Sequence, residues 1–337
     1  MSDRTMRLTA WLGAQLGAPP LAMTAVAGDA SARRYWRIEL GHRTLIAMDA
    51  PPEREDGRRF ARIAAAWRAV GLNLPQVLAA DFEQGFLLIS DLGTKTFLEV
   101  LDAERAERLY RDALGALILI QDRAPTTGLP AYDEALLRRE LAIFDDWLLA
   151  GLLGLSLRDG ELRALATIRD LLVDNALQQP QVAVHRDYHS RNLMVSTPSP
   201  GILDFQDAVL GPLTYDLVSL LRDCYIAWPA ERVQAWLHDY LDLAQERRIL
   251  DPGLIDRVPR WMDLMGVQRH LKAAGIFARL KLRDGRPGYL ADIPRTLDYV
   301  LAVARAYPEL APLADLIDGR VVPAFRAARA GGEERTT

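Results

Sequence analysis

The feature that most constrains the fold is a polar loop, His185 to Asn192, enclosed by short apolar runs. These runs are Val182–Val184, Leu193–Val195 and Ile202–Leu203. Short apolar runs bounded by turn residues predict buried β-strands. We expect the first two to form a hairpin with Asp187 and Asn192 at one end, and the third to deliver Asp204 beside them.

Asp187, Asn192 and Asp204 carry the oxygen atoms that phosphoryl transfer requires. A carboxylate can orient an attacking hydroxyl and accept its proton, while carboxylate and amide oxygens can hold Mg²⁺ on the phosphates of ATP. The order of these residues along the chain also fits phosphoryl transfer. Asn192 follows a His-Arg-Asp sequence, and Asp204-Phe205-Gln206 begins twelve residues after Asn192. We predict Asp187 as the catalytic residue and Asn192 and Asp204 as metal ligands.

Two other residues of this region are expected to support the loop. His185 comes directly after an apolar run, which is typical of a buried structural histidine. Asp216 lies between the turn residues Gly211-Pro212 and the apolar pair Leu217-Val218, a place that suits a helix N-cap. We therefore interpret Asp216 as a brace for the catalytic loop and not as a metal ligand.

These motifs together resemble the aminoglycoside phosphotransferase family, which has a protein-kinase-like fold and phosphorylates small molecules. His189 stands two residues after Asp187, where protein kinases usually carry Lys and this family usually carries His. Only eleven residues separate Asp204 from Asp216, too few for the activation segment with which protein kinases bind peptides. The resemblance implies ATP and Mg²⁺ as cofactors and a small molecule as acceptor.

The pattern of predicted elements agrees with an α+β, bilobal architecture that has a small β-rich N-terminal lobe and a larger, mainly helical C-terminal lobe. Strands are predicted over Arg34–Leu40, Thr44–Met48 and Gly85–Ser90, and a helix over Ala61–Val70. Further helices are predicted over Leu98–Gln121, Tyr132–Leu152, Leu162–Leu177, Val218–Trp228, Val233–Gln245, Arg260–Leu280 and Pro294–Ala306. We expect a nucleotide-binding lobe over 1–90, a catalytic and substrate-binding lobe over 91–325, and a disordered tail over 326–337.

The linker after the Gly85–Ser90 strand is the expected place for the adenine base. Its candidate contacts are Ser90, Asp91 and Leu92. The segment Gly28–Tyr35 stands where kinases have a glycine-rich phosphate loop, but it holds a single glycine. Small residues and the Ser31 hydroxyl could still form a turn over the phosphates, and the alternative is a plain hairpin turn.

The third strand lacks the lysine with which most kinases hold the α- and β-phosphates. Met48 stands near that place, and the predicted helix Ala61–Val70 carries no acid that would pair with a lysine. The loss of both partners together indicates a different way of binding phosphate. Arg33 or Arg34 could supply the missing charge, and Arg34 is our candidate; the alternative is that both arginines lie in solvent.

Four segments narrow the resemblance: Phe86–Gly93, Leu136–Glu140, Asp204–Ala208 and Met265–Lys272. They resemble a family of bacterial kinases that phosphorylate the anomeric (C1) hydroxyl of N-acetylmuramate and N-acetylglucosamine in peptidoglycan recycling. The candidate sugar contacts are Asp207, Asp223, Gln268, Arg269 and His270. Arg269 is the first choice for the lactyl carboxylate of N-acetylmuramate, because a guanidinium binds a carboxylate through paired hydrogen bonds.

Other interpretations remain open. The acceptor could be an aminoglycoside, choline or another sugar, although the basic residues near Gln268–Lys272 do not favour a polycation. A catalytically inactive ATP-binding regulatory module is a second alternative, suggested by the missing lysine. The presence of Asp187, Asn192 and Asp204 together argues against it.

The composition of the chain argues against several classes of protein. With 337 residues and 50% hydrophobic content, the chain can fill two cores. A net charge of −4 without a basic block does not favour nucleic-acid binding. The segment Met1–Pro20 breaks its apolar pattern too early for a signal peptide or membrane span, so we expect a cytoplasmic protein. Cys224, the single cysteine, is expected to be a buried apolar residue, and no obligate protein partner is indicated.

Overall fold

The computed structural model describes residues 3–18, 20, 22–26, 32–41 and 43–333. The chain divides into two compact units. The first unit comprises Met1–Pro125 and Arg191–Asp207, and the second comprises Thr126–Ser190 and Ala208–Thr337. The expected boundary at residue 90 differs from this division, because the linker after that residue and two helices beyond it belong to the first unit, as does the segment that carries Asn192 and Asp204.

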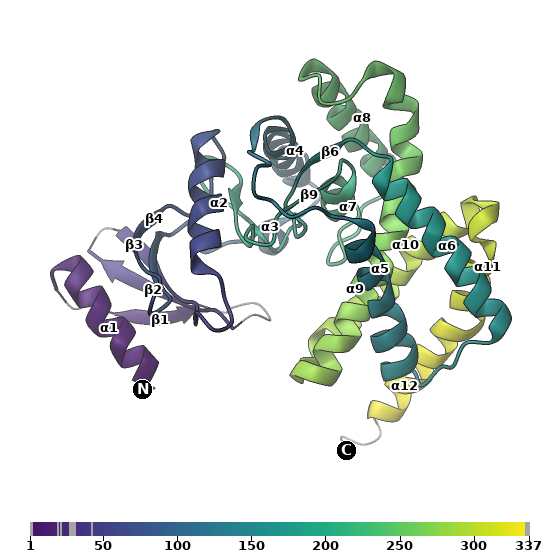
Figure 1. Ribbon diagram of the computed structural model, residues 1–337, viewed down its shortest axis with the longest axis horizontal. Helices are drawn as coiled ribbons and strands as arrows, with labels where there is room; N and C mark the ends of the chain where they lie inside the picture. Colours follow the sequence, from purple (N-terminus) through teal and green to yellow (C-terminus); the bar gives the residue numbers. More distant parts are fainter. Residues whose placement is uncertain (1–2, 19, 21, 27–31, 42, 334–337) are drawn as a thin grey trace. The chain divides into compact units, whose positions relative to one another are not determined.

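The first unit is built on a five-stranded antiparallel sheet with the order β1-β2-β3-β5-β4. Figure 1 labels β1 to β4 of this sheet. The strands are β1 (Met23–Val26), β2 (Arg34–Leu40), β3 (Arg43–Asp49), β4 (Val77–Asp81) and β5 (Phe86–Ser90). The three predicted strands are therefore present, while β1 and β4 were not predicted. In the register of β2 with β3, Tyr35 lies opposite Met48. Because side chains alternate along a strand, Arg33, Tyr35 and Arg37 share one face of the sheet with Met48.

A helix that was not predicted, α1 (Asp3–Leu16), covers the other face of the sheet. Leu8 and Leu12 lie four residues apart on one side of this helix and are fully buried in the core of the unit. The residues of the sheet in this core are Ile38, Leu45, Ala47, Phe86 and Leu88. Arg4 of α1 also forms an ion pair with the buried Asp49 at the end of β3.

In the part of the chain that the structure describes, the rest of the first unit consists of three helices and a small two-stranded sheet. They are α2 (Gly57–Ala69), α3 (Phe97–Val100), α4 (Ala106–Arg123), β7 (Leu193–Met194) and β8 (Gly201–Ile202). The single helix predicted over Leu98–Gln121 is thus two helices, and the first has a capping box between Thr96 and Glu99. β7 pairs with β8, which directs the chain toward Asp204.

The second unit is mainly helical. Its helices are α5 (Glu134–Ile143), α6 (Asp159–Leu177), α7 (Tyr215–Leu221), α8 (Ala230–Glu246), α9 (Val258–Asp284), α10 (Ile293–Ala306), α11 (Ala311–Leu316) and α12 (Val322–Glu333), with the π-helices η1 (Phe144–Leu152) and η5 (Ile317–Val321). Short 3-10 turns lie at η2 (Pro252–Arg257), η3 (Pro287–Asp292) and η4 (Pro308–Leu310). Among the described residues, no helix is both long and apolar enough to cross a membrane.

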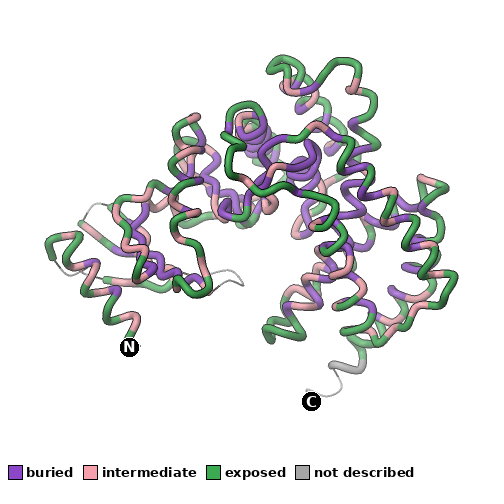
Figure 2. The backbone as a smooth tube through the Cα atoms, viewed as in Figure 1, coloured by how far each residue is buried: buried purple, intermediate pink, exposed green. Residues whose placement is uncertain are grey.

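Helix α9 forms the centre of the second unit. Every residue from Leu264 to Lys272 is buried, so this part of the helix is covered on all sides (Figure 2). Gly275 lets α9 approach the junction of α5 and η1, since a Cβ atom at this position would lie 2.4 Å from the carbonyl oxygen of Ile143. The polar residues of α9 are therefore held in a packed interior.

Two predictions, one about strand pairing and one about the C-terminal tail, were wrong. β6 (Gln181–Val184) does not form a hairpin with β7 but pairs with β9 (Val209–Pro212), a strand that was not predicted. Strands as short as β7 carry too few side chains to specify a partner from sequence. The tail predicted to be disordered from residue 326 is helical through Glu333. Phe325 anchors this last helix in the core, and the alanine and arginine residues that follow favour helix.

Candidate active site

The loop that follows β6 is held by Asp216 of α7. The Asp216 carboxylate accepts hydrogen bonds from the backbone amides of His185 (2.6 Å) and Arg186 (2.9 Å). Arg186 has a positive φ of 78°, a conformation that non-glycine residues seldom adopt without such support. The structure confirms that Asp216 braces the loop, but Thr214 is the N-cap of α7.

Further contacts within the second unit hold His185, Asp187 and Ser190 of the loop. His185 is fully buried, and its Nδ1 atom accepts a hydrogen bond from the amide of Asp187 at 3.2 Å. Asp223, predicted as a sugar contact, accepts hydrogen bonds from both the amide (2.9 Å) and the hydroxyl (2.5 Å) of Ser190. Its other carboxylate oxygen accepts from the amide of Tyr225 at 2.8 Å. The structure thus places Asp223 as a support of the loop.

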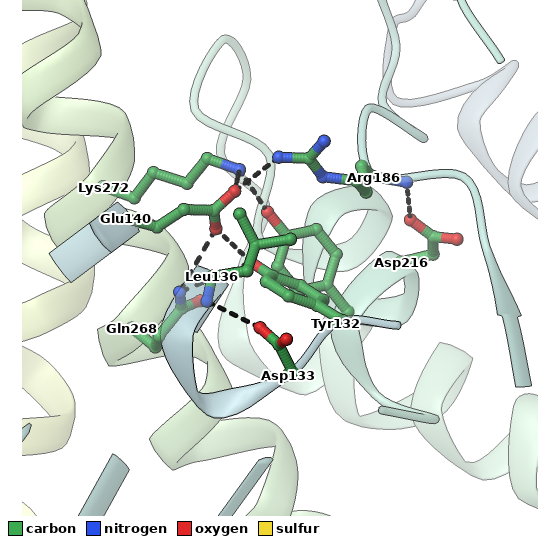
Figure 3. Close-up of polar contacts among 9 residues, drawn as sticks. Tyr132, Asp133, Leu136, Glu140, Arg186, Asp216, Gln268 and Lys272 are labelled. Atoms are coloured by element: carbon green, nitrogen blue, oxygen red, sulfur yellow. Dashed lines mark hydrogen bonds and ion pairs between the residues drawn. The ribbon is translucent and has the colours of Figure 1, made fainter. Parts of the chain in front are cut away.

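A buried network on α5 and α9 extends this support to Arg186. The Glu140 carboxylate forms ion pairs with Arg186 and with Lys272, whose Nζ atom lies 2.8 Å away (Figure 3). Glu140 also accepts a hydrogen bond from the hydroxyl of Tyr132. Lys272 donates to the hydroxyl of Tyr215 at 2.9 Å. Although burial acts to raise it, the pKa of Glu140 lies below its ordinary value because of the charges of Lys272 and Arg186.

The roles of Glu140 and Lys272 were missed from the sequence. Both residues lie in segments that carry the family resemblance, Leu136–Glu140 and Met265–Lys272, but no spacing rule indicates that an acid and a base so far apart in sequence form a pair. Only the packing of α9 against α5 brings them together. A charged residue within an otherwise buried stretch of helix is the one signal that could have identified Lys272.

Asp187 is partly buried and is surrounded by positive charge. Burial alone would raise its pKa, but Lys272 first, and then His189, Arg186 and Arg269, hold the pKa below its ordinary value. Asp187 is therefore an ionised carboxylate at neutral pH. An ionised carboxylate can orient a hydroxyl and accept its proton.

Arg269 differs from the other buried cations of this unit. Its side chain is 6% exposed, and its one hydrogen bond is a weak contact of Nη1 with Cys224 Sγ at 3.7 Å. Within the described part of the chain, no carboxylate lies within ion-pair distance of Arg269, and its Nε atom has no partner. Asp187 and Asp223 act on this guanidinium through their charge without pairing with it, and the unsatisfied Nε atom could donate to a bound anion.

The neighbours of Arg269 on α9 are engaged within the protein. His270 Nε2 lies 2.8 Å from the carbonyl oxygen of Arg222, and its ring stacks on Tyr299. Burial and the charge of Arg269 lower the pKa of His270 to about 3, so this histidine is neutral. The amide nitrogen of Gln268 faces Glu140 at 3.4 Å, while its Oε1 atom has no partner in the described residues.

The first unit contains a cavity of about 330 Å³ on one face of its sheet. Its walls include the strand residues Tyr35, Arg37, Ile46 and Ile89, the linker residues Ser90, Asp91 and Leu92, and the polar residues Asn192 and Asp204. The volume is within the range of small-ligand sites. Five predicted site residues therefore line one cavity. They are the linker residues Ser90, Asp91 and Leu92 and the predicted metal ligands Asn192 and Asp204.

The linker is fixed by an ion pair that was not predicted. Arg37 binds the Asp91 carboxylate through Nε (2.6 Å) and Nη2 (3.1 Å), and also donates to the carbonyl of Gly93 at 2.7 Å. The hydroxyl of Ser90 accepts a hydrogen bond from the amide of Gln76 at 2.8 Å. The side chains of Ser90 and Asp91 therefore hold the linker in place beside the cavity.

Asn192 and Asp204 present the kind of oxygen atoms that Mg²⁺ prefers. Asp204 Oδ1 accepts hydrogen bonds from Arg33 Nη2 at 3.0 Å and from Gln206 Nε2 at 2.8 Å. No group of three or more His, Cys, Asp or Glu residues in the described ranges could hold a metal by itself. A Mg²⁺ ion here would thus share its coordination with phosphate oxygens and water, as it does in other nucleotide sites.

The arginines near the missing lysine are placed differently from our expectation. Arg34, the candidate, is exposed, whereas Arg33 is 9% exposed and paired with Asp204. Strand alternation explains the difference, since adjacent residues point to opposite faces of the sheet. The predicted contact Ser31 lies outside the described residues. Asp207, a predicted sugar contact, is exposed.

Comparisons with known proteins place these sites in context. Residues 22–252 match the sequence profile of the phosphotransferase enzyme family. The chain is 45% identical over 324 residues, 93% of its length and 96% of the relative, to the N-acetylmuramate/N-acetylglucosamine kinase of Pseudomonas putida. It is 47% identical over 329 residues to the protein of the same name from Pseudomonas aeruginosa, covering 94% of this chain and 97% of that relative.

Solved structures show the same fold at much lower identity. A choline kinase from Streptococcus pneumoniae superposes with a TM-score of 0.64 at 12% identity, over 89% of this chain and 100% of that one. An ADP-bound aminoglycoside phosphotransferase superposes with a TM-score of 0.57 at 14% identity, over 87% of this chain and 97% of that one. These similarities confirm the predicted α+β, protein-kinase-like fold.

Proposed function

Because this chain belongs to the phosphotransferase enzyme family, we propose that it transfers the γ-phosphoryl group of ATP to the anomeric hydroxyl of N-acetylmuramate and N-acetylglucosamine. The observation that carries the proposal is the full-length similarity, at 45–47% identity, to two relatives that are named as kinases of these sugars. The proposed product suits the reuse of cell-wall amino sugars. This role and the use of ATP place the proposed reaction in the cytoplasm.

Asp187 is the proposed catalytic residue. Its low pKa keeps the carboxylate ionised, so that it can orient the C1 hydroxyl and accept the proton as the bond to phosphorus forms. An anomeric hydroxyl is more acidic than the other hydroxyls of a sugar, which suits a weak base. The supports from Asp216 and Glu140 restrict the conformation of the loop that carries this carboxylate.

The nucleotide is proposed to bind in the cavity of the first unit, with its base toward the linker Ser90–Leu92. Asn192 and Asp204 would hold Mg²⁺, which when bound neutralises charge on the phosphates. The donor set fits this ion, because both residues offer oxygen atoms to the same cavity.

Arg269 is the proposed contact for the lactyl carboxylate that distinguishes N-acetylmuramate from N-acetylglucosamine. The absence of an acid within ion-pair distance of this guanidinium, in the part of the chain that is described, supports the assignment. N-acetylglucosamine would bind without this contact, since it has no carboxylate. The proposed site therefore accepts both sugars but discriminates between them.

Incubation of the protein with ATP, Mg²⁺ and a panel of sugars tests the reaction. We expect N-acetylmuramate and N-acetylglucosamine to be phosphorylated with loss of their reducing end. Phosphorylated sugars that keep a reducing end would exclude the anomeric hydroxyl, and absence of phosphate on both sugars would exclude the substrate class.

Asp187→Asn should lower kcat by about a hundredfold or more, because general-base assistance is of this size. The affinity for ADP, measured by calorimetry, should stay within about twofold of wild type. Wild-type kcat in this variant would remove Asp187 from the chemistry.

A further inference from the structure

The sheet of the first unit has an apolar side chain at the position from which most kinases extend a phosphate-binding lysine. Met48 is fully buried on the face of the sheet that carries Tyr35 and Arg37, two residues of the nucleotide cavity. Methionine cannot neutralise phosphate charge. If ATP binds here, another cation must reach the same space.

We propose that Arg33 is this cation, and that Glu55 orients it in the way in which a helix acid orients the usual lysine. The proposal deepens the proposed function, since it rests on the binding of ATP in the first unit. It assigns to Arg33 and Glu55 the task that a lysine from the third strand and an acid within the next helix perform in most kinases.

The backbone directs Arg33 toward the nucleotide side of the sheet. Arg33 comes immediately before β2 and has the same parity as Tyr35 and Arg37, whose side chains line the cavity. Arg34 has the opposite parity and is exposed. Two arginines that are neighbours in sequence therefore have different environments.

The guanidinium of Arg33 lies between two carboxylates. Its Nη2 atom is 3.0 Å from Asp204 Oδ1, and its Nε atom is 3.5 Å from Glu55 Oε2. The second oxygen of Glu55 accepts a hydrogen bond from the amide of Ala32 at 3.1 Å. Glu55 thus holds both the side chain of Arg33 and the backbone next to it, and it does so from a position two residues before α2.

Space beside this guanidinium is available for a ligand. A second cavity of about 150 Å³ lies here, and it is lined by residues that include Arg33, Met48, Glu55, Arg59 and Gln206. Met48, which stands at the position of the usual lysine, and Arg33 thus line one cavity. The guanidinium thus extends from the start of β2 into the cavity that the uncharged Met48 also lines.

The pair with Asp204 explains how Arg33 can be buried before ATP binds. Asp204 is also a proposed metal ligand, so without metal its negative charge is balanced by Arg33. If Asp204 held Mg²⁺, the Nη atoms of Arg33 could donate to phosphate oxygens while Nε stayed near Glu55. The planar guanidinium is suited to this exchange, because it binds carboxylate and phosphate through the same pair of N–H groups.

Calorimetric titration of ADP in the presence of Mg²⁺ and without sugar tests the assignment. Arg33→Met should weaken ADP binding by about tenfold or more, since a charge-assisted hydrogen bond is lost. Arg33→Lys should fall between this variant and wild type, because it keeps the charge but loses the paired donors. Arg34→Met is the matched control and should bind ADP within about twofold of wild type.

The dependence on phosphate separates a phosphate contact from a structural role. Adenosine should bind wild type and Arg33→Met equally, and the loss should appear with ADP. An equal loss for adenosine, an unchanged affinity for ADP, or an equal loss in Arg34→Met would each overturn the proposal. These titrations contain no sugar, so a failure of the sugar panel would reject the proposed acceptor and leave the assignment of Arg33 in place.

Discussion

The Nζ atom of Lys272 lies 2.8 Å from Oε1 of Glu140, in the interior of the second unit. Glu140 also pairs with Arg186, the residue before Asp187, so one buried acid connects α9 with the catalytic loop. Lys272 is the strongest of the positive charges that lower the pKa of Asp187. A residue far from the loop in sequence thus contributes to the low pKa of Asp187.

Lys272→Met should therefore raise the pKa of Asp187. The proposed base, Asp187, must be ionised to accept a proton. As the pH is lowered from about 8, kcat/KM should therefore begin to fall at a higher pH in Lys272→Met than in wild type. Lys272→Arg should keep the wild-type profile, and Lys281→Met, at an exposed position of the same helix, should also keep it. Coincident acid limbs for Lys272→Met and wild type would contradict this role.

Arg269→Ala should raise KM for N-acetylmuramate by about tenfold or more, because a charged hydrogen-bonding pair is lost. KM for N-acetylglucosamine should change by less than about threefold, since that sugar has no carboxylate. Arg283→Ala, at the exposed end of the same helix, is the control. Equal effects of Arg269→Ala on both sugars would refute the carboxylate contact.

Asp216 should make the stability of the folded protein depend on pH. Burial raises the pKa of Asp216 from 3.8 to about 6, so the folded state favours the protonated acid relative to the unfolded chain. Its contribution to stability is fully present below about pH 4 and is lost as the pH rises through about 6. This difference in pKa corresponds to roughly 3 kcal/mol.

Comparison with Asp216→Asn isolates this contribution, because asparagine does not titrate. The free energy of unfolding of wild type minus that of Asp216→Asn should decrease between about pH 4 and pH 6, as measured by urea denaturation. Asp239→Asn, at an exposed position, should give a difference that stays constant over this range. A constant difference for Asp216→Asn as well would show that its pKa is not raised.

Gly275→Ala should destabilise the fold by roughly 1–3 kcal/mol, because the new Cβ atom would overlap the backbone of Ile143 and Phe144. The same change at Gly115 in α4 is a matched control, since a Cβ atom there meets no atom within 4 Å. Alanine favours helix over glycine, so Gly115→Ala should be neutral or slightly stabilising. Similar melting temperatures for both variants would argue against the close approach of α9 to η1.

Much of the local structure could be predicted from the sequence. β2 has the predicted bounds, and most long helices lie within a few residues of their predicted ends, because apolar periodicity reports directly on which face is buried. The strand partners could not be predicted. β6 pairs with β9 and not with β7, and pairs as short as these depend on contacts that are distant in sequence.

The sequence by itself determined the candidates for the proposed chemistry, since Asp187, Asn192 and Asp204 are recognisable from residue type and spacing alone. The tertiary structure decided which other residues support them. Strand parity selected Arg33 over Arg34, and the burial of α9 turned Lys272 and Glu140 into an ion pair. The physical reason is that residue type and spacing are local properties, whereas burial and charge pairing depend on which distant segments pack together.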